Sequence, residues 1–460
     1  MSNEIKVSDV HHHVTNYKAG FKTRMNSERS MLMMPMNVVM VAKIKGMITK
    51  DELHKAVETL RKRHAFLAVR VYFDEQDYGW FNTDNVPAVP VRIVESTAPD
   101  TCESLIKSEW KTVFPYETGP LVRLTLVQKV NDCELIVTGH HVICDGTSLT
   151  YLIRDILSQL GKEETGVLPP PPSITLETVP NPKKMKPVQK LIMKIISKKW
   201  NKAGIKFNQK DMNRMLNKFW KLNSRPSICR WELSAETTRN LVSKCRQENV
   251  TVNSALWAAF LSAQYKVQGN KPAFRKQAGM AVSTRNKLKV PVGECLGFYA
   301  SSLSLKLKHV PGISFWDNAR QVHKAIHKEL DKTDIFRMLV TEFLPPTLLD
   351  SFYFCKYDGL DNSLARKMLK QLKWNKTSFG YSITNVGKVN IDTEYGSRKL
   401  EAVYGPLLYS DVNEKVVGIT TVNGILTFSM SCSAENVNSE AVEKIYKQVM
   451  RIIESECSHT

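Results

Sequence analysis

Short apolar runs and helical apolar spacings alternate through the first part of the chain. Apolar runs predict strands at 38–44, 64–72, 89–94, 120–127 and 134–140. Leu53, Ala56, Val57 and Leu60 recur at helical spacing. Thr49 and Glu52 have the spacing of a capping box, so a helix is expected from 50 to 63. Further helices are expected at 102–114 and 149–160, and this mixture predicts an α/β layered unit.

The second half repeats this rhythm. Strands are expected at 228–233, 277–284, 296–305 and 379–386, with a hairpin at 416–431 around Asn423-Gly424. Helices are expected at 235–247, 251–267, 313–330 and 439–454. A chain of 460 residues exceeds the size at which one core stops growing. We therefore predict two domains, 1–167 and 227–460, joined by a crossover at 168–226 that begins with four prolines, 169–172.

Composition narrows the class of protein. Apolar residues make up 42% and charged residues 24%, as in a globular protein. Nine scattered cysteines, an odd number, favour a reducing compartment. The N-terminus has no apolar signal region and no apolar run approaches the length of a membrane span, so a cytoplasmic location is expected. His11, His12 and His13 are expected to be solvated rather than to bind a metal ion.

Positive charge is concentrated in one segment, from Lys183 to Arg225. This segment holds fourteen lysines and arginines and the single acid Asp211, so it carries +13 of the formal +20. Basic residues recur every four positions from Lys186 to Lys218, and a one-sided stripe needs a break in the helix, for which Gly204 is the expected place. A helix is expected from 186 to 203, with an apolar side made by Val188, Leu191, Ile192, Ile195, Ile196 and Trp200.

Three interpretations of this basic helix are open. Its apolar side could pack on the fold, which is the interpretation that we favour. It could instead lie on an anionic membrane surface, as basic amphipathic helices do. Nucleic-acid binding is the third, but the sequence has no recognised motif and no aromatic stacking platform for it.

The most distinctive chemistry lies at 134–149, in the sequence ELIVTGHHVICDGTSL. Neighbouring side chains on a strand point to opposite faces, so His140 and His141 can share a cavity only if the strand ends between them. One histidine is expected to do chemistry and the other to pack. A neutral imidazole is a general base at cellular pH. A purely structural pair is an alternative, and a metal site is disfavoured because no Cys or Glu stands at zinc-like spacing.

The motif His140-His141-x-x-x-Asp145-Gly146 resembles the signature of the CoA-dependent acyltransferase superfamily. This group includes chloramphenicol acetyltransferase, nonribosomal peptide condensation domains, BAHD enzymes, alcohol acetyltransferases and the polyketide-associated mycocerosyl transferases. Other segments resemble the family in the same order, namely 60–67, 118–124, 252–259, Arg285 with 296–298, and 383–387. The late Asp-Phe-Gly-Trp-Gly motif of the BAHD branch is absent, and the nearest stretch is 404–408. The resemblance therefore favours the alcohol acetyltransferase or condensation-like branches.

The resemblance implies two chloramphenicol-acetyltransferase-like α/β domains that form a pseudo-dimer with a tunnel at their interface. His141 would be the general base, with His140 in a packing role. Asp145 would be a structural brace paired with Arg285, beside Gly146. Thr384 and Asn385 would donate hydrogen bonds to the oxyanion. No permanently bound cofactor and no metal are implied, and acyl-CoA would be a co-substrate.

Three functional classes follow from the resemblance. The first is an O-acyltransferase that moves an acyl group from acyl-CoA to an alcohol, which we expect because the sequence carries no carrier, adenylation or ketosynthase segment. The second is a condensation-type enzyme that uses a carrier-protein thioester or an amine acceptor. The third is a binding protein without catalysis. A monomer is expected, and the basic segment would attract CoA phosphates or contact a membrane.

Overall fold

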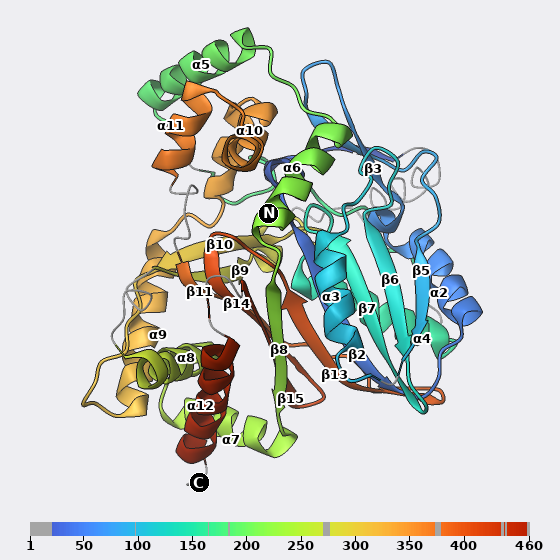
Figure 1. Cartoon of the computed structure of the whole chain (residues 1–460), viewed down its shortest axis with the longest axis vertical. Helices are drawn as coiled ribbons and strands as arrows, with labels where there is room; N and C mark the ends of the chain where they lie inside the picture. The colour runs from blue at the N-terminus through green and yellow to red at the C-terminus, as the bar shows by residue number, and fades with distance from the viewer. Residues whose placement is uncertain are drawn as a thin grey trace, which may run out of the picture.

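Two six-stranded sheets form the centre of the molecule (Figure 1). The computed structural model describes residues 21–457 except 97, 164, 183–184, 270–276, 373–378, 434–436 and 438. The histidines His11, His12 and His13 and the lysines Lys183 and Lys184 lie outside the described residues. The predicted α/β class is confirmed, because helices accompany both sheets and most strands of each sheet come from one half of the chain.

The first sheet has the strand order β12-β13-β2-β7-β6-β5. Its strands are β2 (Asn37–Lys45), β5 (Val91–Glu95), β6 (Val122–Gln128), β7 (Asp132–His140), β12 (Glu394–Tyr395) and β13 (Arg398–Leu407). It is accompanied by the helices α2 (Lys50–Arg63), α3 (Thr101–Lys111) and α4 (Gly146–Leu160). The predicted capping box is present, because the Thr49 side chain accepts from Glu52 N and Glu52 accepts from Thr49 N. Helix α4 contacts both α2 and the central strand β2.

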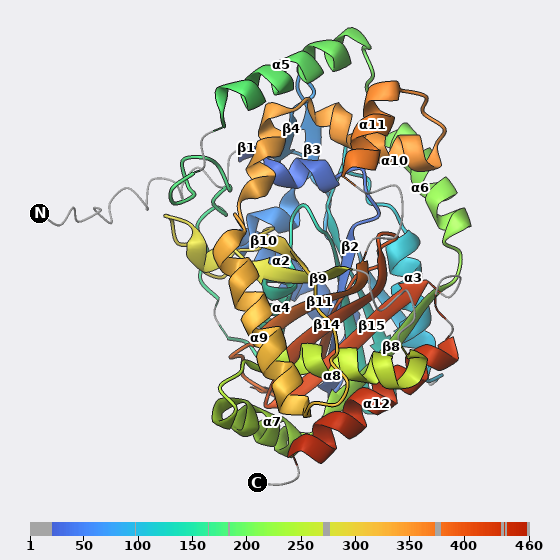
Figure 2. The same ribbon diagram turned by 90° about the vertical axis from the view of Figure 1, so that its left-hand side faces the viewer.

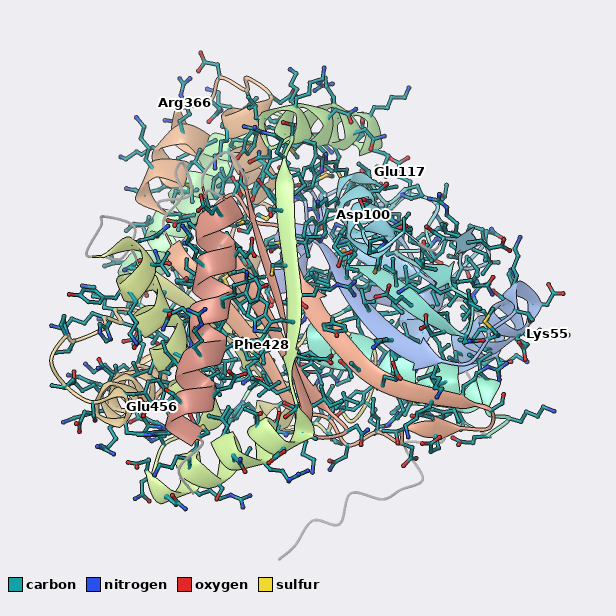
Figure 3. The ribbon with its side chains drawn as sticks, turned by 60° about the horizontal axis from the view of Figure 1, so that its bottom comes forward. Lys55, Asp100, Glu117, Arg366, Phe428 and Glu456 are labelled. Carbon is teal, nitrogen blue, oxygen red and sulfur yellow. The ribbon has the colours of Figure 1, made fainter. Side chains whose placement is uncertain are left out.

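The second sheet has the strand order β10-β9-β11-β14-β15-β8. Its strands are β8 (Pro226–Leu233), β9 (Gln277–Ser283), β10 (Ala300–Leu305), β11 (Phe379–Lys388), β14 (Asn413–Val422) and β15 (Ile425–Ser433). The helices α7 (Ala235–Gln247), α8 (Val252–Gln268), α9 (Phe315–Lys332) and α12 (Ser439–Cys457) accompany it. Phe428 on β15, labelled in Figure 3, is fully buried and stacks on Trp231 with ring centroids 5.0 Å apart. The predicted hairpin turn at Asn423-Gly424 is confirmed.

The two sheets exchange strands. Strands β12 and β13 follow residue 227, yet β13 pairs with β2 of the first sheet, with Leu400 opposite Ile44. The β13–β2 register shifts between Tyr404 and Leu407. A Cβ atom at Gly418 of β14 would overlap the Pro406 carbonyl, so the backbones of the two sheets touch there. The predicted segment 227–460 therefore contributes to both sheets, and its boundary stays a prediction.

A helical group lies at one end of the molecule (Figure 2). It contains α5 (Pro187–Lys202), α10 (Pro346–Tyr357) and α11 (Ser363–Gln371), and α6 (Gln209–Leu222) contacts α10. The sequence patterns did not predict α6, α10 or α11. No helix in the described ranges is both long enough and apolar enough to cross a lipid bilayer.

A small third sheet, β1-β4-β3, lies at the same end and corrects one predicted strand. Its strands are β1 (Lys22–Arg24), β3 (Arg70–Phe73) and β4 (Gly79–Asn82). The predicted strand at 64–72 is wrong in its first part, because residues 65–68 form a 3₁₀ helix. The cause is tertiary: the ring of His64 is buried and is hydrogen-bonded to Asp155 at 2.7 Å. The predicted strand at 296–305 is likewise shorter and begins at Ala300.

Candidate active site

Strand β7 ends between the two histidines. The strand stops at His140, and residues 141–143 form a turn. His140 is 5% exposed, and its ring meets Phe114 edge-on at a centroid distance of 6.2 Å. His141 is partly exposed, and it lines a cavity between the two sheets. The sequence argument made such a strand end the condition for both histidines to share a cavity, yet only His141 lines this one.

The hydrogen bond of His141 fixes which ring nitrogen is free. Nδ1 lies 2.7 Å from the carbonyl oxygen of Cys144. A carbonyl only accepts, so Nδ1 carries the proton and Nε2 keeps its lone pair. Phe298 packs edge-on against the imidazole, with ring centroids 4.9 Å apart. Burial lowers the pKa of His141 below its ordinary value, although the hydrogen bond to Cys144 opposes this shift, so the ring is a neutral base at pH 7.

Asp145 joins the two halves of the molecule. It is the N-cap of α4, where Oδ1 accepts from Ser148 N at 2.7 Å. Its Oδ2 accepts from Tyr299 N at 3.0 Å, and Arg285 Nη2 donates to Oδ1 at 3.2 Å. The carboxylate is 5% exposed. The predicted contact with Arg285 is therefore present, and Asp145 is occupied by structural partners rather than by His141.

Arg285 is held from its other side as well. Its Nη1 donates to the carbonyl oxygens of Gly293 and Cys295, both at 3.1 Å. Its guanidinium carbon lies 4.9 Å from the ring centroid of Tyr299. The side chain is 6% exposed, so the ion pair with Asp145 is shielded from solvent. This arrangement anchors the 285–299 segment to the start of α4.

Gly146 lets the start of α4 approach the exchanged strand. A Cβ atom at this position would lie 2.9 Å from Cγ of Pro406 and 3.0 Å from Cγ2 of Val386. Both distances are shorter than ordinary carbon contacts. Close packing therefore explains why a glycine stands at position 146, because any larger residue would push α4 away from β13 and β11.

The cavity beside His141 has a volume of about 90 Å³, which is room for about three water molecules. Residues from both halves line it, and its polar lining residues are His141, Asp145, Thr147, Ser283, Tyr299, Thr384 and Asn385. The structure thus brings the predicted Thr384 and Asn385 to the same cavity as His141. The Asn385 Oδ1 accepts from Gly387 N at 2.8 Å, which leaves its amide NH₂ for a ligand. The predicted tunnel stays a prediction.

Sequence reasoning did not select Thr147, Ser283 or Tyr299, although all three line the cavity. Thr147 directly follows Gly146 of the motif, and this position in the sequence could have identified it as a residue of the site. Ser283 stands at the end of β9, and its Oγ accepts from Arg285 N at 3.4 Å. Tyr299 donates from its hydroxyl to the Pro172 carbonyl at 2.7 Å, which ties the crossover segment to the site.

A charged network farther along α4 also joins the halves. Arg154 donates to both carboxylate oxygens of Glu294, at 2.7 and 2.6 Å. The neighbouring Asp155 accepts from Arg63 at 2.7 Å and contacts the His64 ring at the same distance. Glu294 lies in the loop whose carbonyls hold Arg285. Helix α4 therefore contacts this loop at two places, through Asp145 and through Arg154.

The basic helix α5 does not pack in the way that we favoured from sequence. Met193, Ile196 and Trp200 contact the helical group, and Trp200 is 1% exposed. The stripe formed by Val188, Leu191, Ile192 and Ile195 is 67%, 59%, 48% and 58% exposed. The packing interpretation is therefore wrong for this stripe, because a neighbouring face of the helix, at positions 193, 196 and 200, makes the contact.

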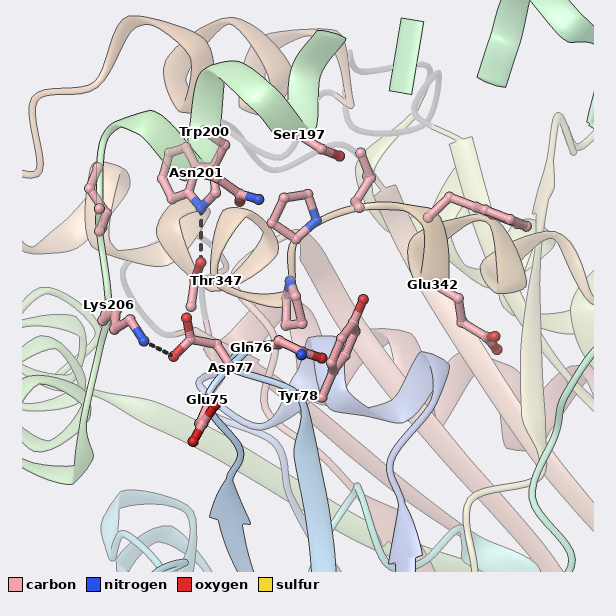
Figure 4. A pocket seen from close by; sticks show the side chains of 16 residues that line it. Glu75, Gln76, Asp77, Tyr78, Ser197, Trp200, Asn201, Lys206, Glu342 and Thr347 are labelled. Atoms are coloured by element: carbon pink, nitrogen blue, oxygen red, sulfur yellow. Dashed lines mark hydrogen bonds and ion pairs between the residues drawn. The ribbon is translucent and has the colours of Figure 1, made fainter. Parts of the chain in front are cut away.

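A separate cavity of about 640 Å³ lies between residues 75–78, 197–206 and 342–347 (Figure 4). Glu75, Asp77 and Glu342 are on its wall, and Lys206 pairs with Asp77 at 3.1 Å. No residue that lines this cavity also lines the one beside His141. This larger cavity is therefore separate from His141, and its volume alone does not make it the candidate active site.

The chain has the two-unit fold of condensation domains and related acyltransferases, and it carries a His-His-x-x-x-Asp-Gly motif at a strand end between the two units. Residues 30–176 match the family model described as the condensation domain. This match covers the segment that holds the His140-His141 motif, and it agrees with the resemblance drawn from the sequence, in which condensation domains form one branch.

Two similar curated proteins are peptide synthetases. Phosphinothricin tripeptide synthetase PhsC of Streptomyces viridochromogenes is 23% identical over 339 residues, which cover 66% of this chain and 28% of that protein. Cyclosporin synthetase simA of Tolypocladium inflatum is 24% identical over 360 residues, which cover 70% of this chain and 2% of that protein. The chain thus spans less than a third of the length of each.

Three solved structures share the fold over nearly the whole chain. The trichothecene 15-O-acetyltransferase TRI3 from Fusarium sporotrichioides has a TM-score of 0.64 at 9% identity, with 95% of each chain covered. The condensation domain of the Monacolin K polyketide synthase MokA has a TM-score of 0.61 at 12% identity, over 95% of this chain and 98% of that one. Polyketide synthase associated protein 5 of Mycobacterium tuberculosis has a TM-score of 0.59 at 14% identity, over 95% and 100%.

Proposed function

We propose that this protein is an acyltransferase that moves an acyl group from acyl-CoA to the hydroxyl of an alcohol. One observation carries the proposal: His141 faces the cavity between the two units, and its Nδ1 is committed to the Cys144 carbonyl. Nε2 is then the group that can accept a proton. A positioned base of this kind contributes about 10²- to 10⁴-fold to the rate.

The reaction needs no covalent enzyme intermediate, because a thioester is already activated. Nε2 of His141 takes the proton of the acceptor hydroxyl while its oxygen attacks the thioester carbonyl. The C–S bond then breaks, and the imidazolium returns the proton to the departing thiolate. The amide NH₂ of Asn385 and the hydroxyl of Thr384 are the proposed donors to the tetrahedral oxyanion. His140 and Asp145 support the geometry without touching the reacting atoms.

A condensation reaction is the second candidate function. It is favoured by the family match over 30–176 and by the peptide synthetases among the relatives. In that case the donor is a carrier-protein thioester or the acceptor is an amine. A binding protein that keeps the fold without catalysis is the third candidate.

Free-thiol release separates these candidates. Acetyl-CoA and longer acyl-CoAs are tested against a panel of alcohols and amines, and carrier-bound acyl groups are tested beside them. We expect turnover of acyl-CoA with alcohols and a loss of about 10²- to 10⁴-fold in His141→Ala. The matched control is His54→Ala, which changes an exposed histidine of α2. Turnover only with carrier-bound groups selects the condensation function, and equal turnover by His141→Ala removes the general base.

We also propose that α5 attaches the protein to an anionic membrane surface. The exposed stripe at 188, 191, 192 and 195 has the i, i+3, i+4, i+7 spacing of one helix face. Lys190, Lys194 and Lys198 are exposed on the same helix, which contains no acid. An apolar stripe beside lysines is the pattern of a helix that lies in the membrane interface. Such a location would bring the site close to lipophilic alcohols.

A further inference from the structure

A cavity of about 530 Å³ adjoins the candidate active site. It lies between α7, the first residue of α8, the end of β11 and the β14–β15 turn. Its volume is within the range of roughly 300–1,000 Å³ that is typical of small-molecule sites.

The wall of this cavity carries three positive charges, and we call it the cationic cavity. Arg239 and Arg246 are seven residues apart on α7, and therefore project from the same side of the helix. Lys388 comes from the end of β11. In the described ranges, none of these three side chains makes a hydrogen bond or an ion pair with another residue. Among the described residues that line the cavity, none is acidic.

A buried hydroxyl points to a ligand independently of these charges. Thr238 lines the same cavity and is 4% exposed. Its Oγ1 is buried and has no hydrogen-bond partner in the described part of the molecule. Buried polar atoms are rarely left unpaired in native proteins. The hydroxyls of Ser243 and Thr421 lie on the same wall, so the cavity offers hydroxyl groups as well as cations.

Asn385 lines both this cavity and the one beside His141. The sheet is irregular at this residue, because the β11–β14 register shifts between Asn385 and Gly387. Such bulges redirect side chains next to active sites. Gly387 has a φ of 81° and lines the cationic cavity, where a side chain would be strained. The cavity that carries the three cations is therefore next to the cavity that His141 lines, with Asn385 on the wall of each.

We propose that this cavity binds the phosphate groups of the acyl-CoA donor, through Arg239, Arg246 and Lys388. The proposal rests on the proposed CoA-dependent acyl transfer. CoA carries a diphosphate and a 3′-phosphate, which bring several negative charges. The phosphodiester of a carrier-bound phosphopantetheine has one charge. The three positive side chains of the cavity, with no acidic residue beside them, balance the charge of free CoA better than the single charge of the carrier-bound group. Guanidinium groups also suit phosphate because they donate in a planar fork.

The test compares ligands with and without these phosphates. CoA itself is titrated calorimetrically into the wild type and into the variant Arg239→Gln/Arg246→Gln/Lys388→Gln. The KM values are then measured for acetyl-CoA and for S-acetylpantetheine, which lacks every phosphate. The control variant is Lys444→Gln/Lys447→Gln/Arg451→Gln, which removes the same charge from exposed positions of α12. Thermal unfolding of each variant establishes that it is folded.

We expect the cavity variant to bind CoA at least about tenfold more weakly and to raise the KM for acetyl-CoA to a similar degree. Its KM for S-acetylpantetheine should change much less, and the control variant should behave as the wild type. Unchanged CoA affinity in the cavity variant, or no CoA binding by the wild type, overturns the inference. A wild type that binds CoA but transfers no acyl group from it contradicts the proposed function instead, and the titration still decides the role of the cavity.

Discussion

At the scale of single residues, His141 is prepared as a base by what surrounds it. Burial lowers its pKa, and its hydrogen bond to Cys144 limits that shift. The acid limb of kcat/KM should therefore lie below the ordinary histidine pKa of about 6.5, because activity is lost only when Nε2 takes a proton. The measurement is kcat/KM for acetyl-CoA across roughly pH 5 to 9. A limb above pH 6.5 would contradict this assignment.

Asp145 and Arg285 form a buried ion pair across the two halves. Asp145→Asn keeps a residue that caps helices well but removes the charge that Arg285 faces. Breaking a buried pair in this way costs about 3–5 kcal/mol. We expect a lower denaturation midpoint in urea, together with lower acyl-transfer activity.

The companion variant Asp145→Asn/Arg285→Met separates charge from shape. It should recover part of the lost stability, because no uncompensated guanidinium remains. Activity lost in Asp145→Asn at unchanged stability would instead indicate that Asp145 takes part directly in the chemistry.

At the scale of elements, α5 presents a testable surface. In vesicle flotation we expect the protein to rise with phosphatidylcholine vesicles that contain phosphatidylglycerol and to stay behind with phosphatidylcholine alone. Each lysine near an anionic surface contributes about 1 kcal/mol. Leu191→Ser/Ile195→Ser should abolish flotation, since the apolar stripe would no longer insert. High salt should weaken binding by screening the lysines.

Two exposed apolar residues elsewhere supply a matched control for α5. Val130 and Leu222 are 77% and 67% exposed, and neither belongs to the stripe. Val130→Ser/Leu222→Ser should float as the wild type does. Absence of flotation with either vesicle rules out the membrane surface. Concentration-dependent dimers that dissociate in Leu191→Ser/Ile195→Ser would assign the stripe to a second copy of the chain.

Strand β13 shows why the sequence patterns missed some elements. Strand β13 contains Gly405-Pro406, which is a breaker signal in a sequence. The structure accommodates this pair where the β13–β2 register shifts. Its partner β2 lies more than 350 residues away, and such pairing leaves no local pattern. The helix α5 was predicted from its amphipathic pattern. The sequence did not show which of its two neighbouring apolar faces, 188–195 or 193–200, packs on the rest of the protein.

The candidate site was predictable where its residues share a motif or a family position. His141, Asp145 and Gly146 are adjacent in sequence, and Arg285, Thr384 and Asn385 came from the resemblance. Tyr299 was not predicted, because its main-chain N–H, rather than its side chain, meets Asp145. The cationic cavity was not predicted because Arg239, Arg246 and Lys388 are ordinary surface residues in sequence and converge only through the fold.

At the scale of the whole molecule, α4 contributes both to the candidate site and to the contact between the two units. Its first turn is capped by Asp145, which also holds Arg285, and Arg154 contacts Glu294 from its middle. Both contacts lie on the loop that precedes Tyr299. Loss of this loop from α4 would therefore weaken the contact between the halves and disturb the cavity at the same time, although β13 still joins the two sheets. Stability and activity should fall together when the interface is weakened.

Acid should weaken the whole fold through its buried histidines. Burial, with His141 and Arg123 nearby, lowers the pKa of His140 to about 3, and burial lowers the pKa of His64 as well. The unfolded chain takes up these protons near pH 6.5, whereas the folded chain does not, so the free energy of unfolding should fall as pH drops below about 6.5. Each such histidine contributes up to about 1.4 kcal/mol per pH unit.

The measurement is urea unfolding at several pH values between about 7 and 4. Asp155 adds to the loss only at lower pH. Burial would raise its pKa, but the hydrogen bonds from His64 and Arg63 outweigh burial and lower it to about 2. His140→Gln removes one titrating group, so its stability should depend less steeply on pH than that of the wild type. A free energy of unfolding that stays constant from pH 7 to 4 would mean that His140 and His64 become protonated inside the fold.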